Sequence, residues 1–136
     1  MRKYIAFLMI FTVIAGGITV YLMAQSKLEV VLNNDTDQEI TGLTITYEGI
    51  KEDVTVPPIA AEDTEVVSIN PKKQSEEDFS EGALLLTYTD EAGTTHTETV
   101  IGYFEKGYRA DAEVTIQSIE EEGKLNMEIE DITNLY

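Results

Sequence analysis

Histidine is the side chain that most often serves in acid–base chemistry, and the single histidine of this chain, His96, lies in the segment TTHTET. A histidine that acts as a general base needs a nucleophile and an orienting acid, and this segment supplies threonine hydroxyls and Glu98. Residues two apart on a strand share a face, so His96 and Glu98 can contact each other. Because the chain lacks a nucleophile motif such as G-x-S-x-G, we expect an exposed strand histidine and a protein that is not an enzyme.

Carboxylate and amide side chains occupy alternate positions in the segment Asn33–Glu39. Calcium loops supply oxygen ligands at a similar spacing. An EF-hand, however, needs glycine where this chain has Gln38, and a bidentate glutamate where it has Thr44. We therefore interpret the segment as a solvated turn, leave calcium binding open, and predict no metal or cofactor.

The residues most typical of a binding surface lie in the segment GYFEKGYRA, which combines three aromatic side chains with two cations. We define Tyr103, Phe104, Lys106, Tyr108 and Arg109 as the candidate partner surface. Aromatic residues and arginine are enriched at the energetic centres of protein interfaces, so the expected partner is another protein. The alternative is structural, because a tyrosine beside a strand commonly fills the end of a β-sandwich.

The chain begins with a long uncharged run, Tyr4–Ala24, whose clearly polar side chains are two threonines. At about 1.5 Å per residue, a helix of that length spans roughly 31 Å, close to the ~30 Å hydrocarbon core of a bilayer. Arg2 and Lys3 precede the run, and basic flanks are retained in the cytoplasm. We therefore predict a cytoplasmic stub at 1–3, one transmembrane helix at 4–24, a linker at 25–27 and an extracytoplasmic domain at 28–136.

A cleaved signal peptide is the alternative to this membrane anchor. The apolar core of a signal peptide usually runs about 7–15 residues, shorter than this one, and Leu22 fits an A-x-A cleavage motif poorly. Cleavage after Ala24 would give a secreted acidic protein that acts as an inhibitor or a cation binder. Both interpretations place residues 28–136 outside the cytoplasm.

Residues 28–136 are strongly acidic. They contain all 26 Asp and Glu and six of the nine Lys and Arg, which gives this part a formal net charge of −20. Such a surface repels the phosphates of nucleic acids and anionic lipid headgroups, and it can attract cations or basic proteins. The chain has no cysteine, which excludes a disulfide framework and a lipoprotein anchor. We expect neither a nucleic-acid partner nor a small-molecule substrate.

Apolar and polar residues alternate along most of residues 28–136, as in the segment ALLLTYT, where Leu84, Leu86 and Tyr88 share one face. Strands are predicted at 28–33, 43–47, 53–56, 64–70, 82–89, 94–104, 112–119 and 125–130, with a charged loop at 72–82. Seven or eight short strands without a helical period predict an all-β fold. We expect an antiparallel, immunoglobulin-like β-sandwich that follows one N-terminal transmembrane helix.

Three stretches, NNDTDQEITGLTITYEGI, VPPIAAEDTEVVSI and LLLTYTDEAGTTHTETVIGYFEKGY, resemble small membrane-anchored extracytoplasmic proteins of Bacillus-type Firmicutes. The resemblance covers most of the chain and implies the same location and fold. It implies no activity and transfers no functional residue. Together with the anchor and the charge, it leads us to expect a single-pass membrane protein whose outer domain is a binding or accessory module.

Overall fold

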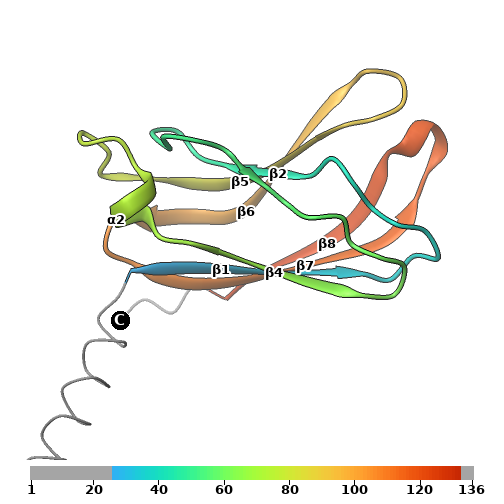
Figure 1. The fold of residues 1–136 in the computed structure, drawn as a ribbon, viewed down its shortest axis with the longest axis horizontal. Coiled ribbons are helices and arrows are strands. Elements are labelled where there is room, and N and C mark those ends of the chain that lie inside the picture. The colour runs from blue at the N-terminus through green and yellow to red at the C-terminus, as the bar shows by residue number, and fades with distance from the viewer. Residues whose placement is uncertain (1–25, 133–136) are drawn as a thin grey trace, which may run out of the picture.

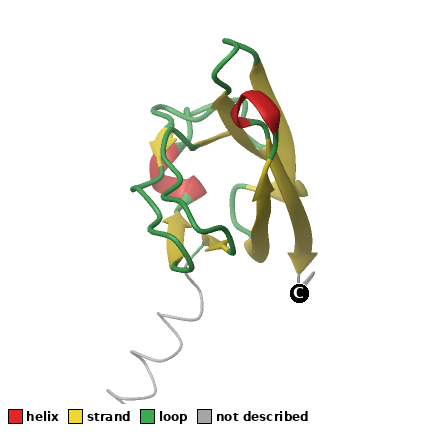
Figure 2. Cartoon of the chain, turned by 90° about the vertical axis from the view of Figure 1, so that its right-hand side faces the viewer, coloured by secondary structure: helices red, strands yellow, loops and turns green. Residues whose placement is uncertain are grey.

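The computed structural model describes residues 26–132, which form two four-stranded β-sheets (Figure 1). Figure 2 shows the strands gathered in two layers, with loops joining them. The predicted β-sandwich is thereby confirmed. No helix in this range is long and apolar enough to cross a membrane. The predicted transmembrane helix at 4–24 lies outside the described residues and stays a prediction.

The first sheet has the strand order β4–β1–β7–β8. It is built from β1 (Lys27–Asn34), β4 (Thr64–Ile69), β7 (Arg109–Ile119) and β8 (Leu125–Ile132). β1 pairs antiparallel with β4 but parallel with β7, with Lys27 opposite Arg109. The expectation of a wholly antiparallel sandwich is wrong at this pair, because the five intervening strands return the chain to the end of the molecule where β1 began.

The second sheet has the strand order β3–β2–β5–β6 and is antiparallel throughout. It is built from β2 (Thr44–Thr46), β3 (Val54–Thr55), β5 (Glu81–Thr89) and β6 (Thr95–Glu105). All eight strands lie within a few residues of their predicted bounds. The predicted loop at 72–82 instead opens with one helical turn, α2 (Pro71–Gln74), in which the Asn70 side chain accepts a hydrogen bond from the Lys72 backbone N–H. A 3₁₀ turn, η1 (Glu121–Gly123), joins β7 to β8.

The core lies between the sheets and is made of the residues that alternate inward along each strand. In β1, for example, Leu28, Val30 and Leu32 are fully buried. One end of this core is closed by three aromatic rings, which we call the aromatic plug: Tyr47, Phe79 and Phe104, with ring centroids 5.1 to 5.6 Å apart.

The two ends of the sandwich differ in the segments that they carry. We call the end where β1, β5 and β7 begin the proximal end; it also holds α2, the aromatic plug and the end of β8 (Figure 1, left). The opposite, distal end holds the loops after β1 and β3 and the tips of the β5–β6 and β7–β8 hairpins (Figure 1, right). Both the first and the last described residues therefore lie at the proximal end.

Candidate functional site

The candidate partner surface lies at the proximal end, where the chain leaves β6 in one sheet, turns, and enters β7 in the other sheet. The Tyr108 N–H donates to the Glu105 carbonyl oxygen at 3.0 Å and closes this turn. The Lys106 N–H donates to the Ser80 carbonyl oxygen at 3.1 Å, just before β5. These backbone bonds fix the turn against its neighbour, so its side chains project from a defined scaffold.

The structure separates the aromatic residues of this segment into two groups. Phe104 is fully buried in the aromatic plug, whereas its neighbour Tyr103 is 44% exposed. The prediction that Phe104 belongs to an exposed surface is wrong, because successive residues on a strand point to opposite faces and Phe104 faces the core. The structural alternative named a tyrosine of this segment, but the residue that fills the end of the core is Phe104, while Tyr108 packs only partly against the core.

The Tyr103 hydroxyl is held by two carboxylates. Its oxygen lies 2.8 Å from Glu105 Oε1 and 2.9 Å from Glu81 Oε2, two residues that face each other across the β5–β6 ladder. The hydrogen bond to Glu105, and then the one to Glu81, raises the pKa of Tyr103 above its ordinary value of 10.0. The Tyr103 ring meets the Tyr108 ring edge-on, with centroids 6.1 Å apart. The two tyrosines thus form one rigid aromatic patch.

The first described residue is fastened to the same turn. The Ser26 hydroxyl lies 2.8 Å from the Lys106 carbonyl oxygen and 3.1 Å from that of Tyr108, and Ser26 is 2% exposed. The Lys27 N–H also donates to the Tyr108 carbonyl oxygen at 3.1 Å. The fold therefore begins inside the predicted linker at 25–27. Sequence reasoning missed this contact, because a single serine before a strand carries no pairing signal.

Charge is unevenly divided between the two ends. Six of the seven basic residues within 26–132 lie at or next to the proximal end: Lys27, Lys51, Lys72, Lys73, Lys106 and Arg109. Of these, Lys27 forms an ion pair with Glu29 at 2.6 Å. The distal loops carry ten carboxylates, at 35, 37, 39, 62, 63, 90, 91 and 120–122, and one cation, Lys124. The proximal end carries carboxylates as well, among them Glu76, Glu77, Asp78, Glu81 and Glu105, so the two ends differ mainly in their number of cations.

His96 lies in the distal half of β6, where its side chain is half-buried. Its ring stacks on Tyr88 with centroids 4.9 Å apart, and its Nε2 lies 2.8 Å from Asp90 Oδ2. The hydrogen bond thus goes to Asp90 across the hairpin, and not to Glu98. The other Asp90 oxygen accepts the N–H groups of the tight turn at residues 92 and 94. His96 and these amides hold the pKa of the Asp90 carboxyl below 3.8, so the pair stabilises the hairpin turn.

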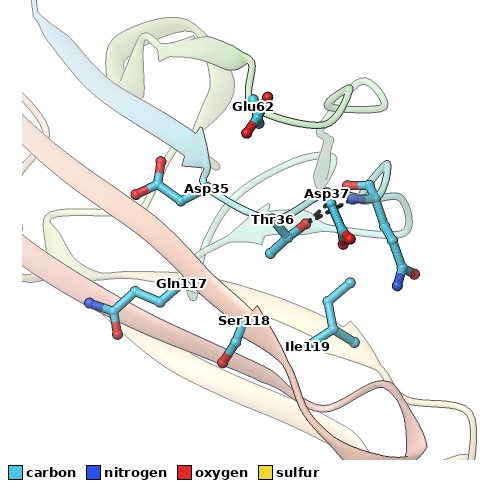
Figure 3. A pocket seen from close by; sticks show the side chains of 8 residues that line it. Asp35, Thr36, Asp37, Glu62, Gln117, Ser118 and Ile119 are labelled. Carbon is cyan, nitrogen blue, oxygen red and sulfur yellow. Dashed lines mark hydrogen bonds between the residues drawn. The ribbon is translucent and has the colours of Figure 1, made fainter.

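The segment Asn33–Glu39 borders a distal hollow of about 410 Å³ that Glu62 and Gln117 also line. Figure 3 shows that the carboxylates of Asp35, Asp37 and Glu62 point in different directions around this hollow. Within residues 26–132, no group of three or more His, Cys, Asp and Glu side chains is placed to hold a metal ion. The predicted solvated turn describes the exposed Asp35, Asp37 and Glu39, whereas Asn34 and Thr36 of the same segment are buried.

Asn34 explains why this loop is polar. It is 1% exposed, and its amide nitrogen donates to the carbonyl oxygens of Gln38, Ile59 and Ala60 at 2.7 to 3.1 Å. Its amide oxygen accepts from both the N–H and the hydroxyl of Thr36, at 3.0 and 2.7 Å. This buried network joins the loop after β1 to the loop after β3. Asn34 therefore has a structural role.

Comparison with known proteins assigns no function to any of these residues. No family model and no curated protein matches the chain. The NMR structure of a protein from Eubacterium rectale is similar at a TM-score of 0.40 and 14% identity, over 78% of this chain and 88% of that one. Function must therefore be argued from the residues of this chain.

Proposed function

We propose that the protein is a single-pass, membrane-anchored module whose β-sandwich stands outside the cytoplasm as a binding or accessory domain. The observation that carries the proposal is a spacing: the uncharged run Tyr4–Ala24 ends two residues before Ser26, which is already buried. A helix of that length is long enough to span a bilayer and would join the sandwich without a flexible stalk. Arg2 and Lys3 favour a cytoplasmic N-terminus.

The sandwich is further proposed to be immunoglobulin-like in architecture. Its two four-stranded sheets support this, as do the four connections that cross between sheets: β1–β2, β3–β4, β4–β5 and β6–β7. Folds of this kind host many functions, so the partner is argued from charge and not from fold. The ten distal carboxylates favour a protein with a basic surface, because they would steer such a partner and repel nucleic acid.

The test compares intact mass with lysine labelling on intact cells. The full-length mass should be found in the membrane fraction and should resist extraction by alkaline carbonate. A membrane-impermeant amine reagent should label Lys124 in the outer domain and leave Lys3 unlabelled until the cells are lysed. The opposite labelling would contradict the topology. A protein in the medium whose mass begins at Gln25 would replace the anchor by the secreted alternative.

A further inference from the structure

The solvent-accessible part of the candidate partner surface lies where the predicted anchor would enter the fold. We propose that the exposed Tyr103 and the half-buried Lys106 and Tyr108, which we call the membrane seat, contact the phospholipid headgroup layer and not a soluble protein. This inference rests on the proposed membrane anchoring. It adds a role for the β6–β7 turn and a fixed orientation for the sandwich.

The short chain between the predicted anchor and the fold limits the distance between the seat and the bilayer. One residue, Gln25, separates Ala24 from Ser26, and the two Cα-to-Cα steps between them span at most about 7 Å when fully extended. The Ser26 hydroxyl in turn lies 2.8 Å from the Lys106 carbonyl oxygen. Because the headgroup region on each side of a bilayer is roughly 5–8 Å thick, the turn stays within reach of the headgroups at any tilt of the domain.

The seat has side chains of the types that membrane interfaces accommodate. The Tyr103 ring is 44% exposed, and its contacts with Tyr108, Glu81 and Glu105 hold it in place. Tyrosine rings are enriched at headgroup depth because they are apolar with one polar tip. The ammonium group of Lys106 is suited to lipid phosphates, since lysine can lay its alkyl stem on apolar surface and extend its charge.

The charge distribution permits this contact with zwitterionic lipid. The net charge of residues 28–136 is −20, which by itself predicts repulsion from anionic lipid. However, most of the basic residues gather at the proximal end, where they partly offset its carboxylates, such as Glu81 and Glu105, and ten further carboxylates lie far away in the distal loops. Lys72 of α2 adds a further cation beside the seat, with its Cε 3.9 Å from where a Cβ at Gly107 would lie. We therefore expect the seat to rest on zwitterionic bilayers.

A seated domain would stand upright on the membrane. β7 runs from the proximal to the distal end through Arg109–Ile119, and ten steps of about 3.3 Å give roughly 33 Å. The distal loops would then lie about that far above the headgroups. A partner that approaches from outside would meet the acidic loops before the aromatic patch.

The absence of cysteine makes single-cysteine labelling possible in the full-length protein. One nitroxide label is placed at Gly107→Cys, because the residue is exposed, its φ is not positive, and an added Cβ would meet only the flexible end of Lys72. A matched label is placed at Glu121→Cys on the distal end. The protein is reconstituted into zwitterionic phosphatidylcholine vesicles that contain a small fraction of lipid with a nickel-chelating headgroup, and no other protein.

The nickel lipid should relax the label at 107 at least roughly threefold more than the label at 121, because the two positions differ in height by about 33 Å. Lys106→Glu, added to the 107-labelled protein, should reduce that relaxation without touching the core. Thr97→Ser, on the same strand, should leave it unchanged. Equal relaxation at 107 and 121, or an unchanged signal in Lys106→Glu, would overturn the seat.

Vesicle flotation keeps this inference separate from the proposed function. Protein that fails to float with the vesicles would refute the membrane anchor, and the seat with it. Protein that floats but shows a mobile, water-accessible label at 107 would leave the anchor intact and refute the seat alone. That second result would point to a protein partner as the occupant of the aromatic patch.

Discussion

Replacing Phe104 by alanine should destabilise the sandwich by about 3–5 kcal/mol, the usual cost of deleting a buried phenylalanine ring. The ring is fully buried, with its centroid 5.1 Å from that of Tyr47 and 5.6 Å from that of Phe79. Edge-to-face contact of this kind contributes about 0.5–1.5 kcal/mol beyond the buried area. Since single domains are stable by about 5–15 kcal/mol, the substitution should remove about a fifth or more of the total free energy of unfolding.

The assay is reversible unfolding of the full-length protein in mild detergent, followed by far-ultraviolet circular dichroism. For a domain of about 100 residues, 1 kcal/mol corresponds to a shift in Tm of about 4–5 °C. Phe104→Ala should therefore melt roughly 12–25 °C below the parent protein. Phe104→Leu, which keeps most of the volume, should cost about 1–2 kcal/mol.

Tyr103→Ala is the matched control, one residue away on the opposite face of β6. Its exposed hydrogen bonds to Glu81 and Glu105 should make its loss cost less than about 1 kcal/mol. Equal destabilisation by Phe104→Ala and Tyr103→Ala would refute the strand register that places one ring in the core and the other on the surface. It would also remove the basis for treating Tyr103 as part of a contact surface.

Three further predictions concern the distal loop, the proximal glycine and the hairpin turn. Asn34→Asp should cost about 3 kcal/mol or more in urea unfolding, because a buried carboxylate would face the three carbonyl oxygens that now accept from the amide. Gly49→Ala should cost about 1–3 kcal/mol in the same assay, because φ is +91° and the new Cβ would lie 2.7 Å from Phe79 Cδ2; an unchanged midpoint would contradict the packing. Asp90→Asn should reduce stability at neutral pH, since the bond with His96 and the turn amides hold the pKa of Asp90 below 3.8. That stabilisation is present above pH 3.8 and is lost as the pH falls through the lower folded-state pKa, so unfolding curves from about pH 7 to about pH 2 should converge for the two proteins.

Strand positions could be predicted because burial follows a period of two in the sequence. Leu84, Leu86 and Tyr88 are buried while Leu85 and Thr87 are half-buried, as their alternation indicated. Pairing between strands distant in the sequence could not be predicted, because β1 meets β7 across 82 residues and neither strand carries a feature that names its partner. The parallel ladder depends on the whole path of the chain and not on local propensity.

The sequence indicated the segment that combines aromatic and basic residues, but not which of its aromatic residues lie in the core and which on the surface. Tyr103 and Phe104 are adjacent aromatic residues, and alternation alone decides which one points inward. That alternation is interrupted upstream, where Val100 and Ile101 are consecutive and both buried at an irregularity in the β5–β6 ladder. The sequence gives no sign of this change in phase, so the correct assignment needed the structure. The contact between Ser26 and the β6–β7 turn could not be predicted from the sequence either.

The central position of β1 has a mechanical consequence. β1 is flanked on both sides, by six paired positions with β4 and eight with β7. A force applied between residue 26 and the distal loops would load both ladders along their length, so many backbone bonds would have to yield together. Force applied instead at Ile132, on the edge strand β8, would peel one ladder bond by bond. The sandwich is therefore built to carry tension from its first strand to its far end, and to be dismantled most easily from its last strand.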